Sequence, residues 1–600
     1  MKLKSLIPLV PAGIILASMF VSHSCANTTS APTGGPKDTI PPVLVAVYPL
    51  PGQMNVPQHR TEMVFKFNEY VQVKDQKSIT FSPPLEKPFK TRISGKSVIV
   101  YFDEDLLPNT TYTIDITGAI VDVNESNPFP GYALTFSTGE RIDSMYVTGL
   151  VQDCITLKPA KGATVMLYKD QADSAVYLHR PDAAVKADDW GFFCLRNIQD
   201  TVFRMYAVID ENGNNMYDPE TEKIAFLDSV ITPKNKVGRD IYELYKFDMM
   251  DTLSCLKRKT EYELNLFKGN PGKQMIVNKV RVDDRTSYIT FMSPNPQIRK
   301  VYFKGIKAKD VIAQFNPERD SLVFWINERR AQPDTLKLTV DYMKTDSTGK
   351  LARTKEKIKL VKPKENKLPA KSYRKDIKHE DTIAVYKVDY KAETFEQDGI
   401  AISFNYPLVK EAFDSLKYEV TNARQKKEKG KYGIERDTND IRAVRIRHIG
   451  KILPGYEYKL TVPERKFMDI NGHYNDSTVV SIKLPDDDKL STLTLHITGV
   501  EKEGPQYIID LMDEKRSAVL RRYTINTDSV LPFPYLKDGN YCIRVACDAN
   551  RNNMVDTGDL LKHLQPEKVR FYKLKDNDFL LAIPSSSEVS QDIDIRKMFE

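Results

Sequence analysis

Short runs of alternating apolar and polar residues, separated by turns rich in Pro, Asn and Gly, recur along most of the chain. The segments 63–67 (Met-Val-Phe-Lys-Phe) and 111–116 (Thr-Tyr-Thr-Ile-Asp-Ile) both have this period of two residues. Such a period places alternate side chains on opposite faces of a strand, and short strands about ten residues apart favour a sandwich. The sequence therefore predicts an all-β fold of tandem antiparallel β-sandwich domains.

The composition agrees with this pattern and limits the possible partners. The chain has 30 Tyr and 26 Phe but only 2 Trp, and aromatic and β-branched residues are enriched in strands. Its 88 basic and 81 acidic residues nearly cancel, which leaves a net charge of +7. Because this excess is small, the charge gives no strong case for nucleic acid, and we expect no nucleic-acid partner.

The first residues have the pattern of a secretion signal. The basic start Met1–Lys4 precedes an apolar stretch, 6–21, that is too short to span a bilayer comfortably, and Ser24 then precedes Cys25. This resembles a bacterial lipoprotein signal, which implies removal of residues 1–24 and lipidation of Cys25. An ordinary secretory signal followed by a free thiol is the alternative, because Ser22 stands where an aliphatic residue is usual.

The stretch after the cysteine is predicted to be a tether. Residues 25–39 are rich in Asn, Thr, Ser, Pro and Gly, and such a composition buries too little apolar surface to fold alone. No later segment is apolar for long enough to form a transmembrane helix. We therefore expect the protein to be held on a membrane by its lipid.

The first folded segment, 40–140, carries a longer motif. It contains Phe-Lys-Phe-Asn-Glu-Tyr-Val at 65–71, Leu-Pro-Asn-Thr-Thr-Tyr-Thr-Ile at 107–114 and Phe-Ser-Thr-Gly at 136–139. This pattern resembles the bacterial Ig-like domain first described in surface-layer proteins. The approach Pro-Thr-Gly-Gly-Pro-Lys-Asp-Thr-Ile-Pro-Pro at 32–42 resembles a lipoprotein family of the Bacteroidota. The resemblance implies a spacer or binding module and argues for structure more than for chemistry.

Later segments repeat this organisation. Residues 141–235 resemble a transthyretin-like or carboxypeptidase-regulatory module, and 489–600 look like a second, diverged copy of it. Residues 381–488 echo the Ig-like motif, for example in Leu-Pro-Gly-Tyr-Glu-Tyr-Lys-Leu at 453–460. Between the two halves, 236–362 is predicted to be an uncharacterised β-sandwich and 363–380 a Lys/Pro-rich linker. A tandem duplication is a plausible origin of this order.

Two Asp/Asn-rich phrases form the one constellation with metal chemistry. Calcium takes six to eight hard oxygen ligands, and alternate residues of a tight loop are able to converge on one ion. The candidate ligands are Asp210, Asn212, Asn214, the Met216 carbonyl and Asp218 in the first phrase, and Asp548, Asn550, Asn552, the Met554 carbonyl, Asp556 and Asp559 in the second. The phrases resemble the EF-hand-like loops of dockerins, which implies Ca²⁺ as the cofactor. No other cofactor is expected.

A polar hairpin is the alternative interpretation of both phrases. In a hairpin the Asp and Asn side chains bond to their own backbone. Position six is Asn215 or Asn553 where glycine is usual, although Asn tolerates the left-handed conformation. Position twelve of the first phrase is Thr221, and Glu222 comes one residue late. The sequence leaves both interpretations open.

The cysteines and the catalytic motifs give little further chemistry. Cys154 and Cys194 are able to form a disulfide if the compartment is oxidising, and the sequence does not decide this. The chain has no Gly-x-Ser-x-Gly and no His-Glu-x-x-His motif, and no pair of its histidines has zinc-ligand spacing. We therefore predict that the protein is not an enzyme.

Three hypotheses about function follow. The first is a lipid-anchored outer-membrane scaffold that partners a β-barrel protein complex in envelope assembly, secretion or surface organisation. The second is a glycan-binding lipoprotein of a polysaccharide uptake system. The only tryptophans weaken this hypothesis, because Trp190 is in a turn before a strand and Trp325 is in an apolar run that favours core packing. The third is an enzyme accessory whose catalytic part would be the middle segment. Residues 26–30 contain no acidic residue, so we favour the periplasmic face of the outer membrane over the cell surface.

Overall fold

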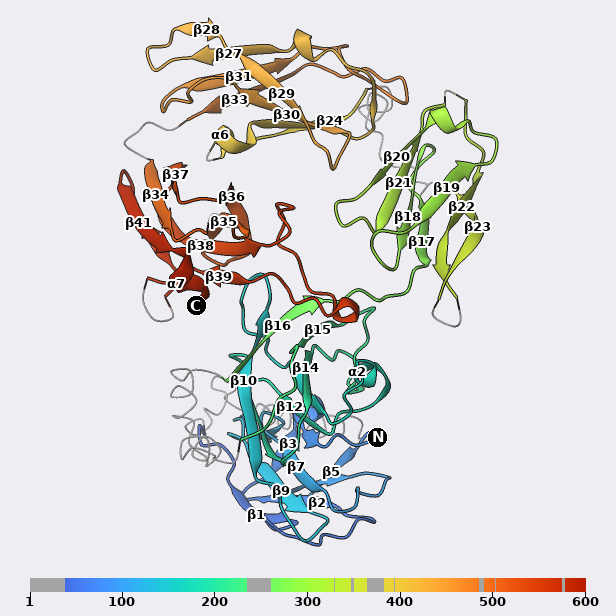
Figure 1. The fold of residues 1–600 in the computed structure, drawn as a ribbon, viewed down its shortest axis with the longest axis vertical. Helices are drawn as coiled ribbons and strands as arrows, with labels where there is room; N and C mark the ends of the chain where they lie inside the picture. Colours follow the sequence, from blue (N-terminus) through green and yellow to red (C-terminus); the bar gives the residue numbers. More distant parts are fainter. Residues whose placement is uncertain are drawn as a thin grey trace, which may run out of the picture. The chain divides into compact units, whose positions relative to one another are not determined.

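The computed structural model confirms the all-β class (Figure 1). It describes residues 38–234, 261–328, 330–346, 350–363, 383–392, 394–484, 490–501, 503–574 and 578–600. The predicted signal, Cys25, most of the tether and all but the first residue of the linker lie outside the described residues. Among the described residues the α-helices are single short turns, α2 (Ala175–Leu178), α6 (Phe395–Asp398) and α7 (Ile595–Phe599), and no helix is long and apolar enough to cross a membrane.

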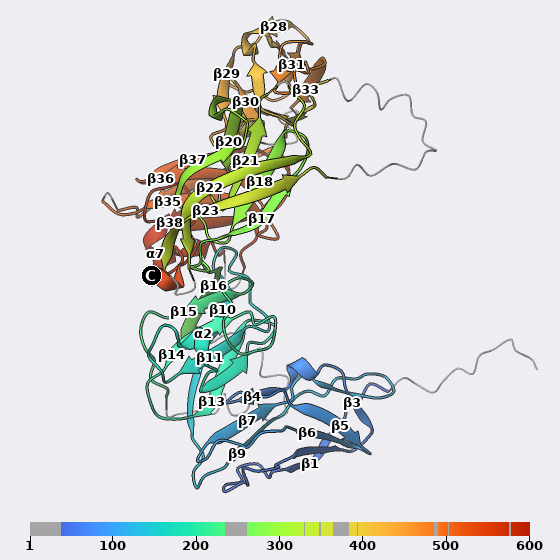
Figure 2. The same ribbon diagram turned by 90° about the vertical axis from the view of Figure 1, so that its right-hand side faces the viewer.

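The first Ig-like domain is a sandwich of two main sheets, seen from the side in Figure 2. One sheet has the order β1-β2-β6-β5, the other has the order β4-β7-β9, and β3 pairs with β8. The strands are β1 (Leu44–Tyr48), β2 (Met63–Phe67), β3 (Val71–Val73), β4 (Thr80–Ser82), β5 (Lys90–Ser94), β6 (Ser97–Tyr101), β7 (Thr111–Asp115), β8 (Ile120–Asp122) and β9 (Ala133–Ser137).

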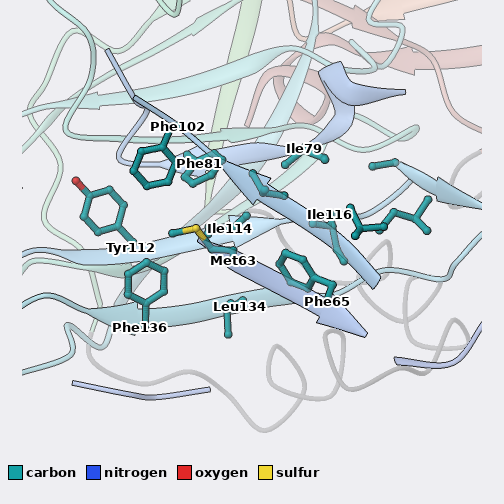
Figure 3. Close-up of a cluster of buried hydrophobic side chains, with 14 of the residues drawn as sticks. Met63, Phe65, Ile79, Phe81, Phe102, Tyr112, Ile114, Ile116, Leu134 and Phe136 are labelled. Atoms are coloured by element: carbon teal, nitrogen blue, oxygen red, sulfur yellow. The ribbon is translucent and has the colours of Figure 1, made fainter. Parts of the chain in front are cut away.

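The core of this domain is formed by the alternate residues that the sequence pattern points inward (Figure 3). Met63 and Phe65 of β2, Ile114 of β7, and Leu134 and Phe136 of β9 are fully buried in one cluster. Because the two-residue period sends the intervening side chains to the other face, one register defines the whole core.

The second module has two connected layers. Its strands are β10 (Met145–Asp153), β11 (Thr164–Tyr168), β12 (Ala183–Lys186), β13 (Phe192–Ile198), β14 (Arg204–Val208), β15 (Lys223–Phe226) and β16 (Tyr262–Lys268). One layer has the order β12-β11-β14-β15 and the other has the order β13-β10-β16. Strand β16 pairs in parallel with β10, and its Leu264 and Leu266 complete the module's core. Thus a strand that the sequence boundary at 235/236 assigned to the middle segment belongs to this module, because its apolar face fills this core.

The middle segment has the strand order of the first Ig-like domain without the β3-β8 pair. Its sheets are β17-β18-β21-β20 and β19-β22-β23, which correspond in chain order to β1-β2-β6-β5 and β4-β7-β9. The strands are β17 (Ile276–Arg281), β18 (Thr286–Phe291), β19 (Ile298–Phe303), β20 (Val311–Phe315), β21 (Ser321–Ile326), β22 (Thr335–Thr345) and β23 (Leu351–Val361).

The predicted second Ig-like segment has the complete order of the first. Its sheets are β24-β25-β30-β29 and β28-β27-β31-β33, with the extra pair β26-β32, so only β28 is added. The strands are β24 (Tyr386–Asp389), β25 (Ile400–Phe404), β26 (Leu408–Lys410), β27 (Lys417–Thr421), β28 (Lys427–Lys429), β29 (Tyr432–Arg436), β30 (Ala443–His448), β31 (Glu457–Val462), β32 (Met468–Asp469) and β33 (Thr478–Lys483).

The last module repeats the second. Its sheets are β37-β34-β41 and β36-β35-β38-β39, and β34 pairs in parallel with β41 as β10 does with β16. The strands are β34 (Ser491–Thr498), β35 (Gln506–Asp513), β36 (Val519–Ile525), β37 (Ser529–Leu536), β38 (Gly539–Asp548), β39 (Val569–Phe571), β40 (Leu581–Ile583) and β41 (Glu588–Asp594).

The two cysteines considered for a disulfide lie on different faces. Cys154 packs in a cluster with Met166 and Tyr168. Cys194 stands between Phe193 and Leu195 on β13, and those two neighbours face the module's core. Successive residues of a strand point to opposite faces, so Cys194 points away from that core, and the structure has no disulfide between the two thiols.

One hydrogen bond recurs at the same place in the first Ig-like domain and in segment 381–488, which has the same strand order. The Tyr112 hydroxyl accepts the Leu107 backbone N–H at 2.9 Å, and the Tyr458 hydroxyl accepts the Leu453 N–H at 2.9 Å. Both rings are buried, and burial raises the pKa of both phenols. Each tyrosine therefore fixes the turn before its strand to the core.

We expect Tyr458→Phe to leave the Leu453 N–H without its acceptor, which costs about 1–3 kcal/mol for a buried donor. Hydrogen exchange measured by mass spectrometry is expected to show faster exchange in the peptide that contains Leu453. Tyr390→Phe, at an exposed ring of the same domain, is the matched control. Unchanged exchange at Leu453 in Tyr458→Phe would contradict this role.

Candidate functional site

The two Asp/Asn phrases occupy the same place in the two repeated modules. The first lies between β14 and β15, and the second between β38 and β39, which are the corresponding strands. Each phrase begins where a central strand of its sheet ends. The modules therefore present two copies of one loop, which we call the first and second Asx loops (210–222 and 548–567).

The backbone of both Asx loops has the same shape. Position four is left-handed in both, with φ of 76° at Gly213 and 60° at Arg551. Position six is also left-handed, with φ of 56° at Asn215 and 63° at Asn553. Asparagine tolerates this conformation better than most residues do, so Asn at position six fits the turn.

The aspartate at position one organises each turn. Asp210 accepts the backbone N–H groups of Asn214 and Asn215 at 3.2 and 2.9 Å. Asp548, which is fully buried, accepts the N–H groups of Asn552 and Asn553 at 3.1 and 2.9 Å. These bonds satisfy donors that the tight turn cannot pair within the sheet.

The aspartate at position nine gathers the two asparagine side chains. Asp218 Oδ2 accepts the side-chain amides of Asn212 and Asn214, the second at 2.9 Å. Asp556 Oδ2 does the same in the second loop with Asn550 and Asn552, the second at 2.8 Å. The residues predicted at positions one, three, five and nine therefore converge in both loops. Met216 and Met554 occupy position seven, between these residues.

A glutamate closes each Asx loop, and sequence reasoning missed its role. Glu222 accepts the N–H of Glu211 at 3.1 Å and of Asp218 at 2.9 Å. Glu567 accepts the N–H of Ala549 at 2.8 Å and of Asp556 at 3.0 Å. Since the two glutamates stand thirteen and twenty residues into their loops, no fixed spacing identifies them. Their position just before β15 and β39 is the shared signal.

Asp559, the predicted ligand at position twelve, has a different role. Its carboxylate accepts the N–H groups of Leu561 and Lys562 at 3.1 and 3.3 Å and caps the 3-10 helix η6 (Leu560–Lys562). It also pairs with the Lys562 ammonium at 2.9 Å. The carboxylate that returns to the second loop is instead that of Glu567.

Charge accumulates inside both loops. Burial raises the pKa of Glu222, and Asp210 and Asp218 raise it further. Burial likewise raises the pKa of Glu567, with Asp556 and Asp548 adding to it. A divalent cation would relieve this repulsion, and carboxylate, amide and carbonyl oxygens are the donors that calcium takes.

The same side chains also satisfy each other without a metal. The asparagine oxygens accept backbone N–H groups, for example Asn214 Oδ1 from Met216 at 2.7 Å, while their amides face Asp218. Among the residues that the structure describes, no group of three or more His, Cys, Asp or Glu is placed to hold a metal ion. The donor set thus fits calcium by chemistry, while the hydrogen bonds fit the hairpin interpretation, and calcium binding stays a prediction.

The second Asx loop also contacts the second module. Leu560 is buried in a cluster with Tyr217, Phe226 and Phe267 of that module. Beside it, the His563 ring is 2.9 Å from the Asp173 carboxylate. Gln565 donates to the Phe226 carbonyl at 3.0 Å and to Asp228 at 2.9 Å. This loop therefore joins modules that are more than three hundred residues apart in the chain.

In a second contact, a loop of the second module packs against the last module. Leu157, from the loop after β10, packs against a cluster of the last module that includes Met512 and Phe571. Arg544 donates to the Ile155 carbonyl at 3.5 Å, and it also holds the fully buried Asp510 at 2.6 Å. Each of the two modules thus inserts one loop against the outer sheet face of the other.

The comparisons with known proteins support the Ig-like assignment of the first domain. Residues 38–138 match the family described as "Bacterial Ig-like domain". No curated protein matches the chain.

Three solved structures align with the chain, each at 10% identity. The Bacillus anthracis TIE protein aligns with 94% of this chain and 76% of its own, with a TM-score of 0.13. BcpA, the major pilin subunit of Bacillus cereus, aligns with 76% of this chain and 99% of its own, with a TM-score of 0.13. The S-layer protein SbsC aligns with 74% of this chain and 66% of its own, with a TM-score of 0.14.

We expect the wild-type chain to take up two calcium ions, one for each Asx loop. Asp218→Ala and Asp556→Ala remove the carboxylate at position nine, and each is expected to abolish one of the two sites in isothermal titration calorimetry. Asp200→Ala, at an exposed carboxylate outside both loops, is the control. An absence of calcium uptake by the wild type would contradict the prediction and favour the hairpin interpretation.

We expect Leu560→Ala to loosen the contact between the second and last modules. Burial of a leucine is worth about 2–5 kcal/mol, so its truncation is expected to expose the loop. Limited proteolysis within 556–566 is then expected to become at least several times faster. Leu564→Ala, at an exposed leucine of the same loop, is the control. Equal rates for the two variants would contradict this contact.

Proposed function

We propose that the protein is a non-enzymatic, lipid-anchored scaffold of a bacterial outer membrane that binds a β-barrel membrane protein complex. In this proposal Cys25 carries the lipid and residues 25–39 hold the first Ig-like domain at the membrane. The scaffold serves envelope assembly, secretion or surface organisation, and the periplasmic face is its favoured side. The sandwich modules supply the surfaces that contact the partner.

The observation that carries this proposal is the fold of the middle segment. This is the one long segment for which the sequence shows no family resemblance, so a catalytic domain is most easily accommodated there. Its described residues have the Ig-like strand order and a sandwich core built from both sheets, with Phe291 and Phe324 from one and Leu338 and Tyr342 from the other. A series of closed sandwiches supports a role in spacing and binding, because each core is filled by its own side chains.

Glycan binding by a polysaccharide uptake system is the second candidate. It is favoured by one observation, the exposed ring of Trp190, which lies in the turn before β13. Trp325 does not add to such a surface, because it is buried and Arg442 lies over its ring at 5.3 Å. An exposed aromatic ring is a platform on which sugars stack, so Trp190→Ala would abolish binding on a glycan array if this candidate holds.

We expect the intact protein to fractionate with the outer membrane and to co-purify with a β-barrel protein in near-stoichiometric amounts. Cys25→Ser removes the site of lipidation and is expected to release the chain from the membrane fraction. Cys547→Ser, which changes a partly buried thiol of the last module, is the control. Protease added to whole cells is expected to leave the wild-type chain intact on the periplasmic side.

Two results would count against this proposal in different ways. Retention of Cys25→Ser in the membrane fraction would contradict the lipid anchor. Recovery of the wild-type chain without a barrel protein would contradict the obligate partner and leave the anchor in place.

A further inference from the structure

An exposed apolar strip runs along one edge of the first Ig-like domain. From Thr39 to Gln58 the chain has no charged side chain, and this segment contains the edge strand β1. Six of its large apolar side chains are exposed to solvent by about half or more. We call these residues the apolar strip: Ile40, Val43, Val45, Tyr48, Leu50 and Met54.

The strip is not a by-product of a poorly filled core. Leu44 and Val47 of β1 pack against the core cluster, so the strand already contributes its inward side chains. Val45 of β1 stays 60% accessible, and Leu50, just after the strand, stays 63% accessible. Contiguous exposed apolar residues on a folded domain mark a contact with a protein or a membrane.

The backbone of β1 argues against a strand as the occupant. The register of β1 with β2 shifts between Leu44 and Ala46, and such a bulge disturbs the outer row of hydrogen-bonding groups. Pro41, Pro42, Pro49 and Pro51 flank the strand and have no N–H to donate. Bulges and prolines are the devices by which sheet edges avoid pairing. The apolar side chains are then the surface left for binding, and they form no directional hydrogen bonds. A lipid surface is able to bind such side chains without directional bonds.

The position of the strip in the chain also favours a lipid surface. Even a fully extended chain from Cys25 to Asp38 spans at most roughly 45 Å, so a lipid on Cys25 keeps the strip close to the bilayer. At such short range a weak apolar contact becomes effectively intramolecular. This step rests on the lipid anchor of the proposed function.

We propose that the apolar strip is a membrane-contacting surface, by which the first Ig-like domain lies against the bilayer to which the chain is anchored. Strip side chains enter the boundary between headgroups and acyl chains, where the affinity grows with the apolar area buried. The contact orients the domain at the membrane, in addition to the attachment that the lipid provides.

Photo-cross-linking tests this proposal with controls of matched exposure. Benzoylphenylalanine replaces Val45 or Leu50 in the full lipidated chain, which is reconstituted into vesicles of phosphatidylethanolamine and phosphatidylglycerol. The control positions are Val530 and Leu178, which are 61% and 64% accessible against 60% and 63% for Val45 and Leu50. Lipid adducts, measured by mass spectrometry, are expected to be about tenfold more abundant at the strip than at the controls, because only the strip enters the bilayer boundary.

A second variant tests the apolar character of the strip. Val43→Asp combined with Met54→Asp leaves the inward side chains of β1 in place and is expected to reduce the adducts at Val45 to the control level. The same double change at Val479 and Val519, which are exposed valines of other modules, is expected to have no effect.

The outcomes separate this proposal from the function on which it rests. The mass of the Cys25 peptide is measured first, and a missing lipid would overturn both the proposed function and the strip contact. A lipidated chain with control-level adducts at Val45 and Leu50 would overturn the strip contact alone. Adducts to a second copy of the chain, or to a co-purified protein in place of lipid, would also overturn it.

Discussion

Parallel pairing between the first and last strands of the second and last modules is the constraint on which their layout depends. In the second module β10 pairs with β16, and in the last module β34 pairs with β41. A parallel pair cannot be closed by a tight turn, so the strands between the two partners, β11 to β15 or β35 to β40, must provide the connection. In the second module Lys234, which follows β15, forms an ion pair with Glu261, which precedes β16. The core is complete only after β16 contributes Leu264 and Leu266.

The Asx loops show how the chain satisfies backbone groups where a sheet ends. Each loop leaves a buried central strand, and the tight turn would expose several N–H groups without partners. Asp210 and Glu222 accept these groups in the first loop, and Asp548 and Glu567 do so in the second. As a result, several carboxylates lie close together in a half-buried place. Burial and the neighbouring aspartates both raise the pKa of the two glutamates. The need to pair these N–H groups therefore explains both the regular conformation of the loops and the cluster of carboxylates that suits a cation.

Much of the fold could be predicted from the sequence, because a period of two residues fixes which side chains are buried. Phe65 and Phe67 face the core as their alternation requires, and the tyrosines of the two similar turns, Tyr112 and Tyr458, make the same hydrogen bond. The closing strand β16 was assigned to the wrong side of a boundary, since residues 227–261 separate it in the sequence from β15. In the candidate site, the residues at positions one, three, five and nine are linked by hydrogen bonds, because local spacing determines a tight loop. The closing role of Glu567 was missed, because the second loop is longer and η6, which Asp559 caps, intervenes.

The second and last modules repeat one strand order but differ in their surface loops. This difference explains how one chain combines similar modules with different contacts. The second and last modules share a strand order and an Asx loop, yet only the second loop is long enough to carry Leu560 into a cluster of the other module. The extension between Asp556 and Glu567 thus turns a structural hairpin into a contact, while the hydrogen bonds at its base stay the same in both copies. Core residues determine the strand order, whereas residues at the loop ends do not. Such a chain is therefore able to gain new contacts through its loops without altering its cores. The exposed side chains in and beside β1 follow the same rule, because Leu44 and Val47 pack against the core while Val45 and the preceding Val43 stay exposed.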